Sequence, residues 1–294
     1  MTKILDKKKS EILWKKVMST AENLPTLPDI VNQVLEQIDN PNSNPHVFQE
    51  IISQDPVLTA KVLKMSNSAY YGYSREIVTI SEAIIILGMD TLKSLAIAAS
   101  AYATLSKEAQ GYGLARGDLW RHSLASATGA RLIAKQLEYK EVEKFFVTGL
   151  LHDIGKILLS SQLGKYIDQI RTITKMRNIS FDLAEREVMG FNHCDVGAEL
   201  SNYWKLPELF SNVARYHHQP LEYQSSRSEE RTLIEIVHIA DILSYNLKIG
   251  MGKDGAFYKP CQEIFDKYHM DKKAIDRIIT KIHSSIKEFE KAIL

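Results

Sequence analysis

The chain has 294 residues, and 45% of them are hydrophobic. This is enough for one or two sizeable cores and excludes a disordered or fibrous protein. Lys and Arg number 37 against 36 for Asp and Glu, so the charge gives no global attraction to nucleic acid or to an acidic membrane surface. The two cysteines, Cys194 and Cys261, are too few for a disulfide framework and fit a reducing compartment.

The sequence also argues against secretion and membrane insertion. Several lysines precede any apolar run at the N-terminus, which does not fit a secretory signal. The longest strongly apolar stretches, 83–89 and 95–105, are shorter than the ~18 residues that a membrane span requires. We therefore expect a soluble cytoplasmic protein without a membrane partner.

Helix punctuation recurs along the chain, whereas alternating runs bounded by hairpin turns are scarce. Asn44 and Asp55 each precede a proline, Pro45 and Pro56. A capping side chain followed by a proline at the first helical position predicts helices that begin near residues 45 and 56. Asp90 predicts the N-cap of a later helix. We predict an all-α protein.

Three polar regions interrupt the helical pattern. Residues 106–117 combine polar side chains with three glycines, which is typical of a connection between domains. A boundary there predicts two helical lobes, over residues 1–106 and 107–294. The polar stretches 219–231 and 250–260 predict surface loops.

The most informative segment is 145–159, an apolar run that contains His152, Asp153 and Lys156. A lone ionised carboxylate in such a setting costs several kcal/mol of desolvation unless a cation or strong hydrogen bonds compensate. Gly155 fits the residue after a helix C-terminus, so His152 and Asp153 are expected in the last turn, where they can converge on one ion. By itself, the pair also fits a buried histidine hydrogen-bonded to its neighbour.

Other imidazoles and carboxylates lie on helical stripes that are predicted to face the core. His122 shares its stripe with small residues, His217 and His218 end a stripe, and His193 stands just before a helix that we expect Asp195 to cap. An antiparallel bundle brings such residues to one level of its core. The predicted metal ligands are His122, His152, Asp153, His193, His217, His218 and Asp241.

Five imidazoles and two carboxylates exceed the needs of one ion. They indicate two divalent transition-metal ions with Asp153 as a bridge. Ligand sets rich in imidazole favour iron, manganese, zinc or nickel over calcium.

The remaining histidines and cysteines leave alternatives open. His238 lies one turn from Asp241 and fits either a residue that orients a metal ligand or a core histidine bonded to a backbone carbonyl. Cys194, beside His193, is a further candidate thiolate ligand. Surface positions are predicted for His46, His269 and His283.

These residues resemble the HD-domain metal-dependent phosphohydrolase superfamily. The resemblance rests on His122, the stretch 152–156, His193, the pair 217–218 and Asp241. Four upstream segments resemble, more specifically, the HDOD domain, the HD-related output domain of bacterial signalling proteins: LPTLP at 24–28, ISQDPVL at 52–58, VLKMSNSAYY at 62–71 and AIIILG at 83–88. The combined resemblance runs from about residue 21 to about residue 245.

The resemblance implies an HD-type helical bundle in the second lobe and a role in bacterial signal transduction. By similarity to the related HD-GYP phosphodiesterases, Asp153 contributes to both metal positions, the first completed by His122, His152 and Asp241 and the second by His193, His217 and His218. It also implies catalytic roles for Asp153 and Lys156, with Lys156 facing a substrate phosphate. The Gly-Tyr-Pro element of those enzymes does not follow residues 217–218, so specificity for cyclic-di-GMP does not carry over.

Two functions from different classes remain open. The first is a regulatory module that retains a binuclear metal site and binds signalling proteins. The second is an active phosphohydrolase or phosphodiesterase that acts on a nucleotide or a cyclic dinucleotide.

Two other features suggest ligands less strongly. Segment 81–94 has the outline of a helix-turn-helix, but its second helix offers only Lys93 as a cation, which disfavours nucleic acid as a partner. The aromatic cluster of Tyr70, Tyr71 and Tyr73 fits either a stacking surface for a ligand or a packed loop between helices.

Overall fold

The computed structural model describes residues 4–23, 33–34, 44–73, 75–254 and 257–293. Across these ranges the chain is helical, and the only β-type pairing is an isolated bridge between Ala109 and Leu114. The predicted all-α class is confirmed.

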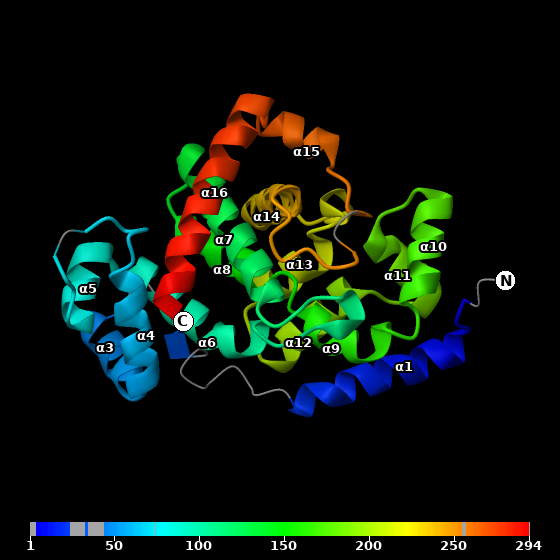
Figure 1. The fold of residues 1–294 in the computed structure, drawn as a ribbon, viewed down its shortest axis with the longest axis horizontal. Helices are drawn as coiled ribbons and strands as arrows, with labels where there is room; N and C mark the ends of the chain where they lie inside the picture. The colour runs from blue at the N-terminus through cyan, green and yellow to red at the C-terminus, as the bar shows by residue number, and fades with distance from the viewer. Residues whose placement is uncertain (1–3, 24–32, 35–43, 74, 255–256, 294) are drawn as a thin grey trace.

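The helices form two lobes (Figure 1). The smaller lobe is built around α3, α4, α5 and α6, and α6 also packs against α8 of the larger lobe. Its helices are α3 (Pro45–Ser53), α4 (Pro56–Ser66), α5 (Ile80–Leu87) and α6 (Met89–Leu105).

The larger lobe is a bundle centred on α7, which packs against α8, α14 and α16. Its helices are α7 (Asp118–Gln136), α8 (Val142–Leu151), α9 (Gly155–Leu163), α10 (Ile167–Arg177), α11 (Phe181–Met189), α12 (His193–Tyr203), α13 (Glu208–Tyr216), α14 (Ser228–Asn246), α15 (Gln262–Lys267) and α16 (Lys272–Ile293).

A helix from each end of the chain packs against the larger lobe, and the C-terminal one also contacts the smaller lobe. Helix α1 (Lys7–Ser19) lies against α9, and Trp14 packs edge-on against Phe191 with ring centroids 5.0 Å apart. Helix α16 packs against both α7 and α4. The boundary near residue 106 stays a prediction, because each lobe receives a helix from the opposite end of the chain.

Small residues let the central helices approach closely. A Cβ on Gly149 of α8 would lie 3.0 Å from the Cα of Ala127 in α7, and a Cβ on Gly129 would lie 3.2 Å from the Cβ of Ala240 in α14. Interhelical distances depend on the side chains at the contact. The small residues that the sequence places beside His122 therefore allow α7, α8 and α14 to meet around that histidine.

The predicted helix starts at residues 45 and 56 are confirmed. The Asn44 side chain accepts from the amide of His46, and that of Asp55 accepts from the amides of Val57 and Leu58. The N-cap predicted at Asp90 is wrong. The cap of α6 is Gly88, whose φ of 84° is costly for other residues, and Asp90 lies in the first turn.

Two further local predictions need correction. Asn192 caps α12, and Asp195 completes a capping box from the third helical position, so His193 is the first residue of the helix. Gly155 does not end a helix: α8 stops at Leu151, and Gly155 opens α9. His152 and Asp153 consequently lie in the turn between two helices.

The polar segments of the sequence contain a helix start and buried side chains, in addition to exposed loop residues. Helix α14 begins at Ser228, inside the stretch 219–231. In 106–117, which was predicted as a connection between domains, Tyr112 is fully buried and its hydroxyl donates to Glu185 at 2.6 Å. In 250–260, Asp254 is only 1% exposed. These buried polar contacts join distant parts of the chain, so local composition gives no sign of them.

Of the three tyrosines in the aromatic cluster, two pack against other parts of the fold and one is exposed. The rings of Tyr70 and Tyr71 meet edge to face at 4.9 Å, and both contact Phe289 of α16. Tyr73 is 54% exposed. The segment predicted to resemble a helix-turn-helix includes the N-terminal part of α6, where Lys93 is only 3% exposed.

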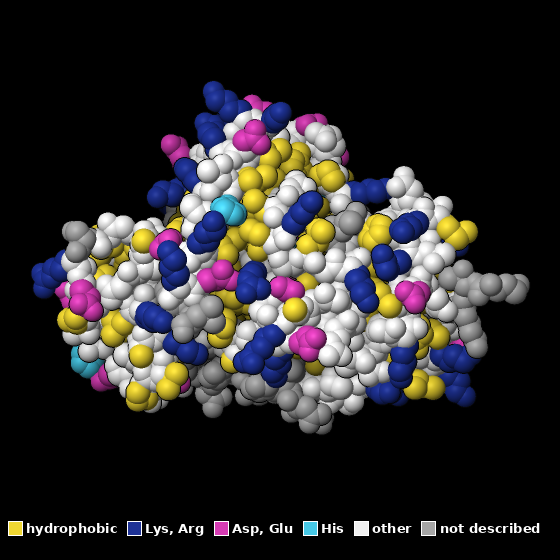
Figure 2. Space-filling model, in the orientation of Figure 1, with side chains coloured by type: hydrophobic (Ala, Val, Ile, Leu, Met, Phe, Trp, Pro, Cys, Tyr) yellow, Lys and Arg dark blue, Asp and Glu magenta, His cyan; other side chains and the backbone are white. Residues whose placement is uncertain are grey.

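The surface mixes both signs of charge. Lys and Arg side chains are spread over the face shown in Figure 2, with Asp and Glu side chains among them. Of the helices described, none combines the length and apolar character that crossing a bilayer requires.

Gly155→Ala tests the contact between α9 and α12. A Cβ at this position would lie 2.1 Å from the carbonyl oxygen of His193 and 2.5 Å from the amide nitrogen of Gly197. Because both are backbone atoms that cannot move aside, we expect a loss of more than about 3 kcal/mol in the free energy of unfolding, measured with urea. Gly164→Ala is the control: a Cβ there meets nothing within 4 Å, so its change should stay within about 0.5 kcal/mol. Equal effects would contradict the packing argument.

Candidate metal centre

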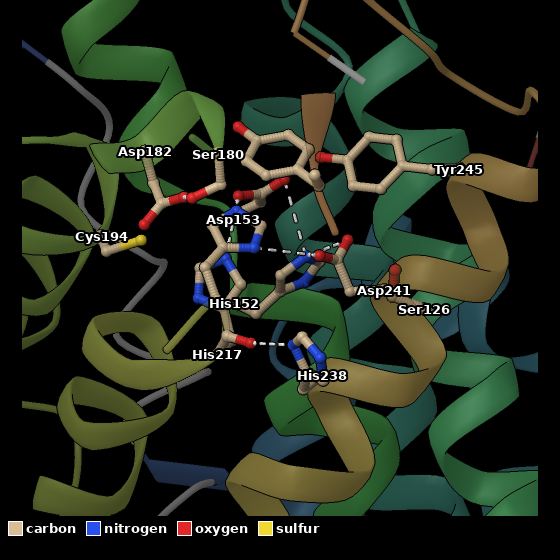
Figure 3. Close-up of polar contacts among 12 residues, drawn as sticks. Ser126, His152, Asp153, Ser180, Asp182, Cys194, His217, His238, Asp241 and Tyr245 are labelled. Carbon is tan, nitrogen blue, oxygen red and sulfur yellow. Dashed lines mark hydrogen bonds and ion pairs between the residues drawn. The ribbon is translucent and has the colours of Figure 1, made fainter. Parts of the chain in front are cut away.

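The structure brings all seven predicted ligands into one buried region of the second lobe. They come from α7, the α8–α9 turn, the start of α12, the end of α13 and the middle of α14. None of the seven is more than 7% exposed. Figure 3 shows His152, Asp153, His217 and Asp241 facing one another at its centre.

The first group of ligand atoms comprises His122, His152, Asp153 and Asp241, and all four atoms lie within 4.8 Å of one another. His122 Nε2 lies 3.2 Å from Asp153 Oδ2 and 3.0 Å from Asp241 Oδ1. His152 Nε2 lies 3.3 Å from the same oxygen of Asp241. Two ring nitrogens and two carboxylates thus enclose a position of the size that a metal ion occupies.

The second group comprises His193, Cys194, His217 and His218, again within 4.8 Å. Asp153 Oδ1 lies 3.4 Å from His193 Nε2 and 3.6 Å from His217 Nε2. Its other oxygen faces the first group, so the two oxygens of Asp153 are divided between the groups.

Backbone carbonyls fix the tautomers of two of these imidazoles. The Nδ1 atoms of His152 and His217 lie 2.7 Å from the oxygen of Gly149 and 2.9 Å from that of Ala214. A carbonyl oxygen only accepts, so each Nδ1 carries the proton and donates it. In the neutral ring, the lone pair is then on Nε2 and faces the carboxylates.

Side chains orient the imidazoles of His193 and His122 in the same way. Glu185 Oε2 lies 2.6 Å from His193 Nδ1. The Ser244 hydroxyl donates to the backbone oxygen of Asp241 at 2.7 Å and lies 2.9 Å from His122 Nδ1, so the ring donates to it. Outer contacts of this kind set the orientation of metal-ligating imidazoles. The sequence analysis missed Glu185 and Ser244. Glu185 contacts His193 from the preceding helix, and Ser244 contacts His122 across 122 positions of the chain.

Several buried acceptor atoms in the two groups lack a hydrogen-bond donor. Among them are Asp153 Oδ1 and His217 Nε2, which lie 3.6 Å apart. An unpaired buried acceptor costs about 1–3 kcal/mol, and more when it is charged. The donor set therefore fits bound cations.

The electrostatics around Asp153 favour an ionised carboxylate. Burial by itself raises a carboxyl pKa. Lys156 and His152 outweigh that effect and hold the pKa of Asp153 well below its ordinary range. Burial lowers the pKa of His122, but hydrogen bonds to Asp153 and Asp241 raise it to about 9. Without a metal ion, a proton on His122 thus supplies positive charge to the first group.

Burial keeps other members of the cluster neutral. Burial and the neighbouring His217 hold the pKa of His218 well below its ordinary range. Burial raises the pKa of the Cys194 thiol to about 12. A neutral imidazole is the form that binds a metal, whereas the thiol must lose its proton to do so.

Lys156 is buried and held by three acceptors. Its Nζ lies 2.7 Å from Asp153 Oδ2, 2.8 Å from Asp254 Oδ2 and 2.8 Å from the Tyr245 hydroxyl. Because these acceptors belong to the protein itself, the contact of Lys156 with a substrate phosphate stays a prediction. Asp254 was not identified from the sequence, because segment 250–260 shows no helical periodicity and its fold depends on tertiary contacts.

Tyr258, from the same segment, covers the second group. Its ring stacks on His218 with centroids 4.0 Å apart and an interplanar angle of 15°, and its hydroxyl donates to Asp254 at 3.2 Å. A cavity of about 380 Å³ lies beside this pair, lined also by Asp182 and Gln219. His218, a member of the second ligand group, thus lines this cavity together with Tyr258.

The structure resolves the alternatives for His238. Its Nδ1 donates to the backbone oxygen of His217 at 2.7 Å, as Figure 3 shows. Its Nε2 accepts from the amide of Cys261 at 3.0 Å. His238 is a core histidine satisfied by backbone groups, and one of those groups belongs to a predicted ligand. The remaining histidines, His46, His269 and His283, are exposed as predicted.

Comparisons with known proteins agree with this fold. An HDOD domain model matches residues 24–220. An uncharacterized protein of Treponema pallidum is 28% identical over 208 residues, which cover 69% of this chain and 40% of that protein. The chain thus matches less than half the length of this relative.

Comparison with solved structures also finds an HDOD domain protein among the similar folds. An HDOD domain protein of unknown function from Geobacter sulfurreducens has a TM-score of 0.71 and 27% identity, over 96% of this chain and 98% of that one. A protein from Shewanella amazonensis, provisionally described as a phosphohydrolase, has a TM-score of 0.69 and 24% identity, over 95% and 98%; it supports the fold alone. With two thirds of its length matched by the family model, the chain belongs to the HDOD family.

Proposed function

We propose that this chain is a regulatory HDOD module whose second lobe holds two divalent transition-metal ions. The observation that carries the proposal is the pair of atoms Asp153 Oδ1 and His217 Nε2, which lie 3.6 Å apart without a hydrogen-bond donor. An anionic oxygen and a ring lone pair repel each other at this separation. A cation bound by both removes the repulsion and the desolvation cost together.

The proposed ligands follow the two groups. His122, His152 and Asp241 hold the first ion, His193, His217 and His218 hold the second, and Asp153 bridges them. Mixed nitrogen and oxygen donors favour iron, manganese, zinc or nickel. When bound, such ions lower the pKa of a coordinated water and polarise a phosphoryl oxygen.

The closed state of the site supports a regulatory role over catalysis. The three donors of the Lys156 ammonium are matched by Asp153, Asp254 and Tyr245, and the Tyr258 ring covers His218. Structural metal sites are closed, whereas catalytic sites keep a position open for water or substrate. In this proposal, the ions stabilise the bundle, and its surface binds signalling proteins in the cytoplasm.

A phosphohydrolase acting on a nucleotide or cyclic dinucleotide is the second candidate. It is favoured by the cavity of about 380 Å³ beside His218 and Tyr258, a volume typical of small-molecule sites. Asp153 and Lys156 would meet a phosphate there only after Tyr258 and Asp254 move. Turnover of a nucleotide panel by the metal-loaded protein would favour this candidate, whereas two bound ions without turnover would favour the regulatory module.

Asp153→Ala should abolish binding of both ions, because each position loses a shared anionic ligand. The measurement is elemental analysis of anaerobically purified protein, with about two ions per chain expected for the wild type. The control is Asp182→Ala, which removes another buried carboxylate outside both ligand groups and should leave the metal content unchanged. Full metal content in the Asp153 variant would rule out the bridging role.

Asp254→Ala should expose the Lys156 ammonium to external anions. The Asp254 carboxylate is ion-paired with the Lys156 ammonium and repels a phosphate. Its removal should therefore tighten the binding of inorganic phosphate to the metal-loaded protein about tenfold, or ~1.4 kcal/mol. Isothermal titration calorimetry measures this, and Asp276→Ala, at an exposed position, is the control. An unchanged phosphate affinity would show that Asp254 does not close the site.

A further inference from the structure

Cys194 is a buried cysteine at the edge of the second ligand group. It is the second residue of α12, directly after His193, and is 1% exposed. Both cysteines of the chain are free. Figure 3 shows the Cys194 sulfur pointing from its helix toward the cluster, so the thiol has access to the same space as the imidazoles.

The distances around Cys194 match those between ligands of one ion. Its Sγ lies 3.5 Å from His193 Nε2, which lies 3.1 Å from His218 Nε2. Around a tetrahedral zinc, a sulfur and a nitrogen ligand are about 3.6 Å apart, and two nitrogen ligands about 3.3 Å apart. With His217 included, the four ligand atoms lie within 4.8 Å of one another.

A second observation indicates a cation at this place independently of the cysteine. His217 Nε2 has no hydrogen-bond partner, and the side chain is completely buried. Its Nδ1 already donates to the backbone oxygen of Ala214, so the lone pair of Nε2 is available to a metal. The unpaired lone pair of His217 Nε2 therefore favours a cation in the second group, whether or not Cys194 is a ligand.

We propose that Cys194, as a thiolate, is a further ligand of the ion of the second group, beside His193, His217, His218 and the bridging Asp153. The inference rests on the proposed function, because it concerns one of the two metal positions. The divalent ion displaces the thiol proton, which leaves to solvent, and a metal–sulfur bond replaces the S–H bond. The oxidation state of neither partner changes.

This ligand gives the two positions different chemical preferences. Thiolate is a soft ligand that favours zinc or ferrous ion over manganese. The first group offers two imidazoles and two carboxylates, a harder set that also accepts manganese. The protein would then hold a softer ion beside Cys194 and a harder one beside Asp241.

Cobalt(II) is the probe, because a cobalt–thiolate bond gives a charge-transfer band in the near ultraviolet. The chelator-treated 294-residue chain is titrated with cobalt(II), and absorption and bound cobalt are recorded together. We expect the band in the wild type and in Cys261→Ser, the control at the other cysteine. We expect the band to disappear in Cys194→Ser, with a loss of at least about tenfold in affinity at one position and retention of the other cobalt ion.

The possible outcomes separate this inference from the proposed function. If the wild type binds two cobalt ions without the band, Cys194 is only a thiol that donates to His193, and the inference is overturned while the binuclear site stands. The same holds if Cys194→Ser retains the band. If the wild type binds no cobalt, zinc or manganese, the metal centre and the thiolate ligand are both wrong.

Discussion

The structure depends on a buried anion, the Asp153 carboxylate, placed between two sets of imidazole nitrogens. Its two oxygens face opposite groups, with His122 Nε2 at 3.2 Å from one and His193 Nε2 at 3.4 Å from the other. Lys156 neutralises part of the charge. Lys156 and His152 favour the ionised carboxylate and outweigh the cost of its burial. Toward the second group, however, Asp153 Oδ1 and His217 Nε2 have no hydrogen-bond donor, and we propose that bound cations compensate these two atoms.

Hydrogen bonds from the surrounding fold fix the orientation of three of these imidazoles. Carbonyl oxygens or acidic side chains accept from Nδ1 of three rings, which directs each Nε2 inward. Close helix contacts keep these partners in place, as at Gly155, where α9 leaves no room for a Cβ beside His193. Asp254 pairs with Lys156, and the Tyr258 ring stacks on His218. These two contacts are the reason why we propose a regulatory module and not an enzyme with an open site.

The sequence predicted the features that local pattern encodes. The fold class followed from capping residues such as Asn44 and Asp55. The candidate ligands, which stay predictions, followed from polar residues in apolar runs. Tertiary contacts could not be predicted from the local sequence pattern. Asp254 lies in a segment without periodicity, and Glu185 contacts His193 from another helix. Gly155 matches the local pattern of a helix end. Its actual constraint is the close approach of α12, whose residues lie about forty positions away.

Anomalous diffraction from crystals of the manganese- or iron-loaded protein tests the central claim most directly. The account predicts two peaks about 3.5–4 Å apart, one on each side of the Asp153 carboxylate, within bonding distance of the imidazoles of the two groups. A map with the same side-chain arrangement but no anomalous peak between Asp153 and His217 would contradict it.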